Sequence, residues 1–324
     1  MGEIKALRSL MHKILLILAL SVLSIPAMAE NAAPELPENA IYSERGTATC
    51  LKCHDKGPTL DIMHTSHAVS GDKRSPMAQM GCESCHGPSS AHATAKPQPG
   101  QKRPAPAVNF GGQDISPVAQ RNAICISCHE SGMRMNWQGS QHQNNDVACT
   151  SCHSSHKMND PVLDKQTQPE ICFTCHTDQR AQTLRPSHHP IREGKVACSD
   201  CHNPHGSAAP NMLVKNRLTD TCYECHAEKR GPYLWEHAPV REDCMLCHSP
   251  HGTVQPRLLK ERPPFLCQNC HDGTRHPGKP YAATGSTISG NAVGPAVQSL
   301  ARGCLNCHSE VHGSNHPSGN FNLR

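Results

Sequence analysis

The chain has 324 residues, of which 36% are hydrophobic and 3% aromatic, and its formal net charge is +4. This composition excludes two or three ordinary domains, because Phe 4, Trp 2 and Tyr 4 supply too few large apolar side chains to offset the chain entropy of close-packed cores. It also argues against a disordered chain, since Cys 20 and His 24 are unusually abundant. Something other than side chains is expected to fill the interior.

The N-terminus is typical of an exported protein. Three basic residues precede an apolar run over residues 14–25, and residues 27–29 (Ala-Met-Ala) match the small-x-small cleavage pattern. The run is shorter than the roughly 20 residues of a membrane span, so we predict a signal peptide at 1–29 rather than a retained anchor. Residues 30–49 are expected to form a flexible leader.

Every cysteine of the chain belongs to one recurring motif, CxxCH. In chain order the ten motifs are Cys50/Cys53/His54, Cys82/Cys85/His86, Cys125/Cys128/His129, Cys149/Cys152/His153, Cys172/Cys175/His176, Cys198/Cys201/His202, Cys222/Cys225/His226, Cys244/Cys247/His248, Cys267/Cys270/His271 and Cys304/Cys307/His308. CxxCH attaches c-type haem, because two thiols one helical turn apart can bond the vinyl groups of one porphyrin edge while the adjacent imidazole ligates the iron. A zinc site or a disulfide framework would not require a histidine after all ten CxxC pairs. We therefore predict ten covalently attached haem c groups with the ten motif histidines as proximal iron ligands.

The other histidines recur in a fixed order. Each of five units contains a first CxxCH, a lone histidine, a second CxxCH and a final histidine, and the units are unit 1 (50–92), unit 2 (125–156), unit 3 (172–205), unit 4 (222–251) and unit 5 (267–312). The lone and final histidines are the candidate distal iron ligands, namely His67, His92, His142, His156, His189, His205, His237, His251, His276 and His312.

Three further histidines leave alternatives open. His64 could replace His67, His188 could replace His189, and His316 could replace His276 or His312. Methionine can also ligate haem iron. With histidine in surplus, however, we expect Met133 and Met135 to make apolar contacts to haem.

Helix-start signals precede the first motif of several units, so short helices are expected there. The signals are Ser116-Pro117 before Val118, Pro169 before Cys172, and Thr219 with Asp220 before Cys222. The Pro- and Gly-rich stretch 87–115 is expected to be a long loop.

The predicted architecture is an elongated haem array. Alternating strand patterns are nearly absent, which predicts mostly irregular coil with short α-helices and few or no strands. The porphyrins would serve as the hydrophobic interior, so that cofactor binding supplies the folding free energy. A midpoint divides the array into an N-terminal pentahaem half (50–185) and a C-terminal pentahaem half (186–324).

The full set of distal histidines predicts electron transfer rather than catalysis. An iron ligated by two imidazoles has no open position for a substrate, whereas a multihaem reductase, the class-distant alternative, keeps at least one haem open. The sequence has no altered motif such as CxxCK, no nucleophile elbow and no phosphate loop. It also has no basic stripe with interleaved aromatic residues, so no nucleic-acid partner is expected.

Three segments resemble the MtrA/DmsE-type decahaem cytochromes: CSDCHNPHGS (198–207), DTCYECHAEKRGPYLWEHAPV (220–240) and CLNCHSEVHGSNHPSG (304–319). The resemblance covers nearly the whole mature chain. It implies bis-histidine ligation and a periplasmic location at the outer membrane, partly inside a β-barrel porin. Such a barrel would shield a polar coil from lipid.

The resemblance also implies the electron-transfer partners. Electrons would pass between periplasmic or inner-membrane cytochromes and an extracellular multihaem cytochrome. The terminal acceptor or donor would be a metal oxide, DMSO or Fe(II), and the direction of flow is open. The alternative is a freely soluble periplasmic multihaem electron shuttle.

Overall fold

The computed structural model describes residues 40–271, 303–306 and 308–317. The expected signal peptide (1–29), the first part of the expected leader, His276 and Cys307 lie outside the described residues.

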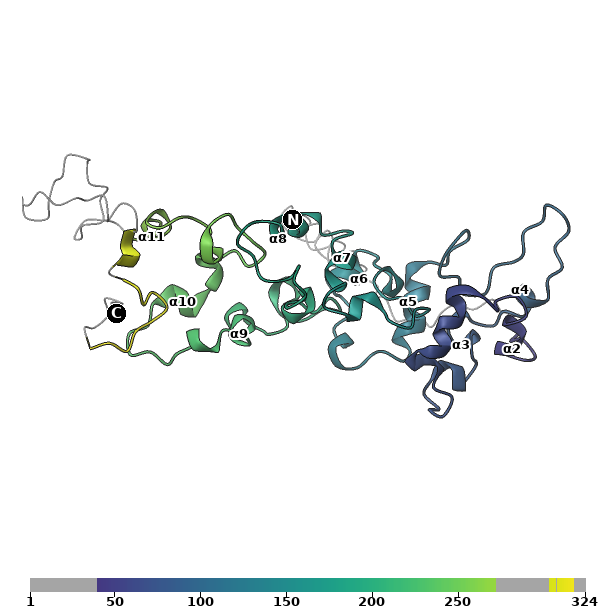
Figure 1. Cartoon of the computed structure of the whole chain (residues 1–324). Coiled ribbons are helices and arrows are strands. Elements are labelled where there is room, and N and C mark those ends of the chain that lie inside the picture. Colours follow the sequence, from purple (N-terminus) through teal and green to yellow (C-terminus); the bar gives the residue numbers. More distant parts are fainter. Residues whose placement is uncertain (1–39, 272–302, 307, 318–324) are drawn as a thin grey trace, which may run out of the picture.

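The described chain forms an elongated body made of short helical turns (Figure 1). The α-helices are α2 (Thr47–Cys50), α3 (Glu83–His86), α4 (Ser90–Thr94), α5 (Val118–Ile126), α6 (Gln141–Asn144), α7 (Gln168–Cys172), α8 (Thr177–Thr183), α9 (Leu218–Tyr223), α10 (Ala238–Glu242) and α11 (Phe265–Gln268). The helices follow the long axis in nearly the order of the sequence, from α2, α3 and α4 at one end to α11 at the other.

Short 3-10 helices lie between and after the α-helices. They are η1 (Gly57–His64), η2 (Ser66–Ala68), η3 (Pro76–Ala78), η4 (Gly132–Arg134), η5 (Cys149–Ser151), η6 (Pro161–Leu163), η7 (Cys198–Asp200), η8 (Pro210–Met212), η9 (Ala227–Lys229), η10 (Cys244–Leu246), η11 (Pro256–Leu258) and η12 (Gly303–Asn306). Over the described ranges, extended segments form only isolated bridges, such as Ser187 with Thr253. The predicted fold class, short helices in irregular coil with few or no strands, is confirmed.

In units 2 to 5 the two motifs lie on different kinds of turn. The first motif of each unit starts on an α-helix, in order α2, α5, α7, α9 and α11, as the sequence predicts. The second motif lies on a 3-10 turn in units 2 to 5 (η5, η7, η10 and η12) and on α3 in unit 1.

The helix-start signals act in different ways. Pro169 lies in the first turn of α7, where its missing N–H costs no hydrogen bond, and Pro117 directly precedes α5. Thr219 and Asp220 lie inside the first turn of α9, and no side chain caps that helix. They therefore do not act as the cap that the sequence suggests.

The prediction that 87–115 is a loop throughout is wrong for residues 90–94, which form α4. Gly87 ends α3 with a positive φ of 67°, and the amide of Ser90 donates to the carbonyl of Ile41. This contact holds one helical turn in place, and the turn carries His92.

The end of the expected leader packs against unit 1. Ser43 is buried, and its amide and hydroxyl both donate to the carboxylate of Glu83. The amide of Ser89 donates to the same carboxylate at 2.8 Å. Three donors from two segments therefore satisfy a carboxylate that is itself only 3% exposed.

Side chains alone form only a small apolar core. The buried apolar residues of the described chain are Ile62, Val108, Trp137, Ala148, Phe173, Ile191, Ala197, Ala209 and Leu213. They are scattered along the body rather than gathered at one centre, as the poverty in large apolar side chains predicts.

Candidate haem array

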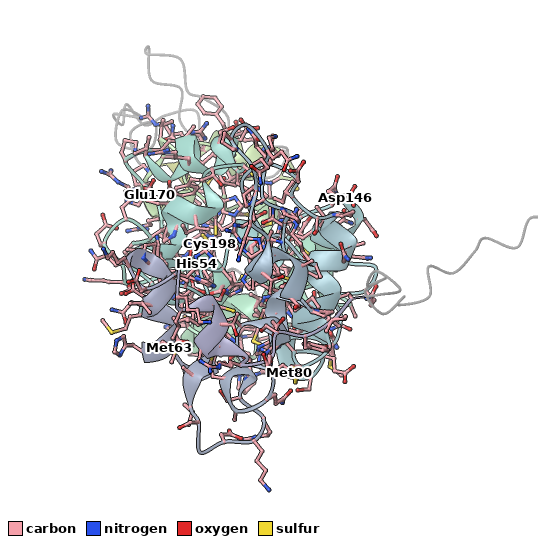
Figure 2. All side chains as sticks on the ribbon, turned by 90° about the vertical axis from the view of Figure 1, so that its right-hand side faces the viewer. His54, Met63, Met80, Asp146, Glu170 and Cys198 are labelled. Carbon is pink, nitrogen blue, oxygen red and sulfur yellow. The ribbon has the colours of Figure 1, made fainter. Side chains whose placement is uncertain are left out.

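One connected cavity of about 4660 Å³ runs through the described chain and is lined by residues of all ten CxxCH motifs. A pocket for a single small ligand measures roughly 300–1,000 Å³, so this cavity has room for several large cofactors. In the end-on view of Figure 2, His54 and Cys198 lie toward the middle of the body, whereas Asp146 and Glu170 lie at its edge.

Each motif closes one helical turn around this cavity. In all ten motifs the histidine amide donates to the carbonyl of the first cysteine, at 2.9–3.0 Å. Residues three and four apart on a helical turn share one side. The CxxCH spacing therefore presents two thiols and one imidazole to the same region.

Histidine rings face one another in pairs across the cavity. In the part of the chain that the structure describes, nine pairs have ring centroids 6.0–6.3 Å apart, and each pair contains one motif histidine and one candidate distal histidine. The pairs are His54–His92, His86–His156, His129–His67, His153–His205, His176–His142, His202–His251, His226–His189, His248–His312 and His271–His237.

This separation fits two imidazoles on opposite sides of one iron. A metal–imidazole bond is about 2.0 Å and the ring centre lies about 1.1 Å behind the bonded nitrogen, so the two centres would be about 6.2 Å apart. The described residues contain no group of three or more His, Cys, Asp or Glu side chains that could hold a bare metal ion. Each facing pair could therefore hold an iron whose remaining ligands would come from a porphyrin.

The pairs interlock successive units. The lone histidine of a unit faces the first motif of the next unit, as His142 faces His176, and the final histidine faces the second motif of the preceding unit, as His205 faces His153. At the N-terminal end, His92 faces His54 within unit 1. The His153–His205 pair also crosses the expected boundary between residues 185 and 186.

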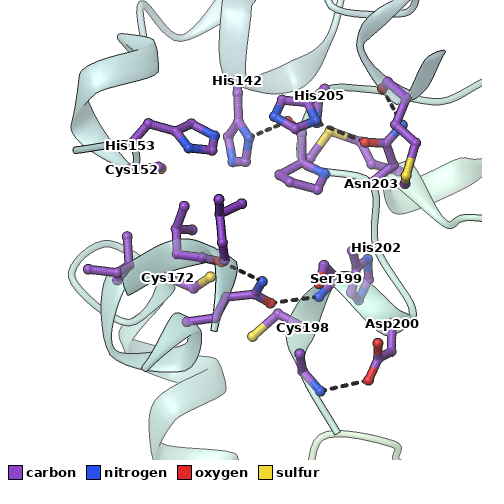
Figure 3. A pocket seen from close by; sticks show the side chains of 18 of the residues that line it. His142, Cys152, His153, Cys172, Cys198, Ser199, Asp200, His202, Asn203 and His205 are labelled. Carbon is purple, nitrogen blue, oxygen red and sulfur yellow. Dashed lines mark hydrogen bonds between the residues drawn. The ribbon is translucent and has the colours of Figure 1, made fainter. Parts of the chain in front are cut away.

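The cysteines place consecutive motifs side by side. Within a unit the first cysteines of the two motifs interact, as Cys172 does with Cys198, and their hydrogen bond raises the pKa of Cys172 and lowers that of Cys198. Between units the second cysteines are neighbours, as the Cys175 thiol adds to burial in raising the pKa of Cys152. In Figure 3 the rings of His142, His153 and His205 lie on one side of the gap and Cys172 and Cys198 on the other.

Contacts between first cysteines within a unit and between second cysteines of adjacent units alternate along the chain. First-cysteine contacts join Cys50 with Cys82, Cys125 with Cys149, Cys222 with Cys244, and Cys267 with Cys304; second-cysteine contacts join Cys85 with Cys128, Cys201 with Cys225, and Cys247 with Cys270. The motifs are therefore neighbours in the order of the sequence.

Backbone carbonyls orient many of the facing rings. His142 Nδ1 is 2.8 Å from the carbonyl oxygen of Pro204, and His202 Nδ1 is 2.9 Å from that of Asn211. A carbonyl accepts only from a protonated Nδ1, which leaves the Nε2 lone pair free to bind a metal. The same contact joins His86 to Val108, His92 to Pro104, His189 to Pro250, His237 to Val311, and His248 to Arg257.

The neighbouring histidines differ in placement. His189 faces His226, whereas the adjacent His188 contacts the Arg185 carbonyl through Nδ1 and lies 3.5 Å from Glu193 through Nε2. His67 faces His129, whereas His64 is exposed at the end of η1.

The methionines after the third motif also differ. Met133 lines the cavity, whereas Met135 is 70% exposed and does not line it. The expected apolar contact to haem therefore fits the position of Met133, whereas Met135 lies outside the cavity lining.

Two buried nitrogens of the cavity lining lack a protein partner in the described chain, Arg134 Nε and His205 Nδ1. A porphyrin carries two carboxylates, which are the partners that a guanidinium selects, so Arg134 fits a haem environment. Burial, together with the nearby His153 and Arg134, lowers the pKa of His205 to about 4. The ring is therefore neutral near pH 7, as iron ligation requires. Sequence reasoning missed Arg134, because nothing in its local sequence marks it.

Family comparisons cover most of the chain in pieces. The doubled CXXCH motif family (Paired_CXXCH_1) matches residues 188–231 and 237–276. The cytochrome c-type protein NrfB-like family matches residues 82–169, and the cytochrome c554 and c-prime family matches residues 26–87. The chain thus carries multiple CXXCH haem c sites.

Named relatives extend these matches. The multiheme cytochrome MtrA of Shewanella baltica is 48% identical over 279 residues, which cover 86% of this chain and 81% of that protein. The cytochrome c-type protein NrfB of Escherichia coli O6:H1 is 30% identical, covering 44% of this chain and 73% of that protein. NrfB of Haemophilus influenzae is 27% identical, covering 40% and 65%.

No helix of the described residues has the length and apolar character needed to cross a bilayer. The MtrA match spans most of both chains. The chain therefore belongs to the MtrA family of multihaem c-type cytochromes, which transfer electrons.

Proposed function

We propose that this chain binds ten covalent haem c groups and conducts electrons along them across the outer membrane. The observation that carries the proposal is the row of facing histidine rings, each pair 6.0–6.3 Å apart and each containing one CxxCH histidine. When bound, haem supplies a reversible one-electron Fe(III)/Fe(II) couple, and closely spaced haems pass electrons from one to the next.

The protein's part is to hold and close each iron. Two motif cysteines would anchor each porphyrin, and the motif histidine and its facing partner would occupy both axial positions. With both positions filled by imidazoles, the iron would have no place for a substrate, which favours electron transfer over reduction of a small molecule. Backbone carbonyls fix the imidazole tautomer that this role requires, as the Pro204 carbonyl does for His142.

The pairing pattern supports a proposal for the tenth distal ligand. At the N-terminal end His54 has no preceding unit, and it faces His92 of its own unit. By the same rule His308, which has no following unit, would take His276, the lone histidine of its own unit. His276 lies outside the described residues, so this assignment rests on the repeat alone.

The proposed location is the periplasmic side of the outer membrane, with part of the chain inside a β-barrel porin. The kinship with MtrA and the elongated, coil-rich body favour it, because a polar coil needs a barrel wall between itself and lipid. The partners would be periplasmic or inner-membrane cytochromes on one side and an extracellular multihaem cytochrome on the other. The pentahaem halves 50–185 and 186–324 would form one continuous path through the His153–His205 pair.

Purification tests this location. We expect the protein to copurify with a large β-barrel protein from detergent-solubilised outer membranes, and not to be released by osmotic shock. Quantitative release into the periplasmic fraction without a barrel would favour the freely soluble shuttle. Steady turnover of nitrite, hydroxylamine or sulfite would instead favour a multihaem reductase.

A further inference from the structure

His153 differs from the other facing histidines in what its Nδ1 atom contacts. Its partner is the Asp160 carboxylate, with Nδ1 and Oδ2 2.7 Å apart. The Asp160 side chain is only 14% exposed, and its Oδ1 accepts from the amides of Ser154 and Val162. Backbone contacts thus hold the carboxylate against the ring.

The equivalent histidines of other units use neutral acceptors. His202 and His248, also in second motifs, donate to backbone carbonyls nine residues later at 2.9 Å. His226 has a carboxylate nearby, but Glu228 is 3.7 Å away and both side chains are more than half exposed. A close, buried carboxylate contact therefore distinguishes His153 from these three.

A carboxylate acceptor changes the electronic character of an iron ligand. It draws the Nδ1 proton more strongly than a carbonyl does and makes Nε2 a stronger donor. The extra electron density and the nearby negative charge both stabilise Fe(III) relative to Fe(II). Second-shell hydrogen bonds of this kind are one of the protein's means of setting haem potentials.

We propose that Asp160 is a positioning residue that lowers the reduction potential of the haem held by His153 and His205. The inference rests on the proposed ligation of that haem. On the opposite face, His205 Nδ1 lacks an acceptor in the described chain, so only the proximal ring is polarised in this way. Arg134 is the nearby positive group, but in the described chain it forms no hydrogen bond with either ring, and a haem carboxylate would neutralise it.

The position of the His153 haem in the array means that its potential would affect conduction. His153 belongs to the fourth motif of ten, with the motifs neighbours in sequence order. A low-potential haem there would be a step that every electron crosses. Asp160 would therefore influence the rate of electron flow through the N-terminal half.

The test uses the full-length holoprotein carrying D160N, with D243N as a matched control. Asp243 also caps a 3-10 turn, accepts a hydrogen bond from the amide of Met245 two residues later, and precedes a second motif, but among the described residues it forms no hydrogen bond or ion pair with a histidine ring. D160N should raise the reduction potential of this haem. At the potential where the wild-type haem is half reduced, its ferric-to-ferrous ratio should fall about tenfold, which corresponds to a shift of 59 mV for one electron. The low-spin EPR signal of that haem should change as well.

D243N should leave both readouts unchanged at the His153 haem. The inference would be overturned if D160N kept its full haem content and the His153 haem kept its wild-type reduction potential. It would also be overturned if D243N shifted that potential equally. D160A provides a second test, because it removes the contact without presenting an amide group to the Ser154 N–H. Covalent haem is counted by mass in the same samples, so missing haem in the wild type would contradict the proposed function, whereas unchanged potentials would contradict only the role of Asp160.

Discussion

His142 Nδ1 lies 2.8 Å from the carbonyl oxygen of Pro204, the residue directly before His205. His142 faces His176 and His205 faces His153, so one contact joins two facing pairs. The same relationship joins His189 to Pro250 before His251 and His237 to Val311 before His312. Adjacent units thus contribute to each other's sites, and the array is continuous across the expected midpoint.

The adjacent histidines 188 and 189 give a matched pair of variants. H189A should leave the His226 iron with one open axial position, so that the reduced protein binds about one more carbon monoxide per chain than wild type. H188A should bind no more than wild type, because its ring contacts Arg185 and Glu193 instead. Optical titration with carbon monoxide measures both. The ligand assignment would be wrong if H188A, rather than H189A, gained the site.

The C-terminal histidines test whether the last unit pairs its own lone histidine with its second motif. H276A should open one haem to carbon monoxide, and added imidazole should close it again. H316A should keep a wild-type spectrum. The reverse result would show that the repeat fails at the C-terminal end and that His316 ligates iron there.

The angles between facing rings predict two classes of EPR spectrum. The planes of His67 and His129 make 90°, and those of His86 and His156 make 84°, whereas His153 with His205 and His248 with His312 make 12°. Perpendicular axial imidazoles leave the iron orbitals nearly degenerate, which gives strongly anisotropic low-spin signals.

The oxidised protein should therefore show a minority of strongly anisotropic haems beside ordinary rhombic ones. H67A should remove one of the anisotropic signals. A spectrum with rhombic signals alone would contradict the ring geometry.

The buried carboxylate of Glu83 should hold the N-terminal end together. E83A leaves the amides of Ser43 and Ser89 without their acceptor, so we expect it to destabilise unit 1 by about 1–3 kcal/mol. S43A removes the hydroxyl donor alone and should cost less. Guanidinium unfolding and proteolysis near residues 40–49 measure the change. Equal stability of E83A and wild type would contradict this role.

Much of the site could be predicted from sequence because the spacing of residues within each CxxCH motif determines it. The CxxCH motif closes one helical turn by itself, and the recurring order of histidines identified the same residues that the structure brings to face the motifs. The partner of each histidine could not be predicted, because His142 and His205 face motifs of other units. The contact between Asp160 and His153 could not be predicted either, because the folded chain decides whether a histidine Nδ1 meets a side-chain carboxylate or a backbone carbonyl.

In the proposed holoprotein, porphyrins fill the cavity between facing imidazoles and take the place of an apolar core. The intact mass of the mature, exported chain shows whether they do. We predict the mass of the polypeptide plus ten covalent haem groups. A stably folded, exported chain with fewer covalent haems, or with none, would contradict it.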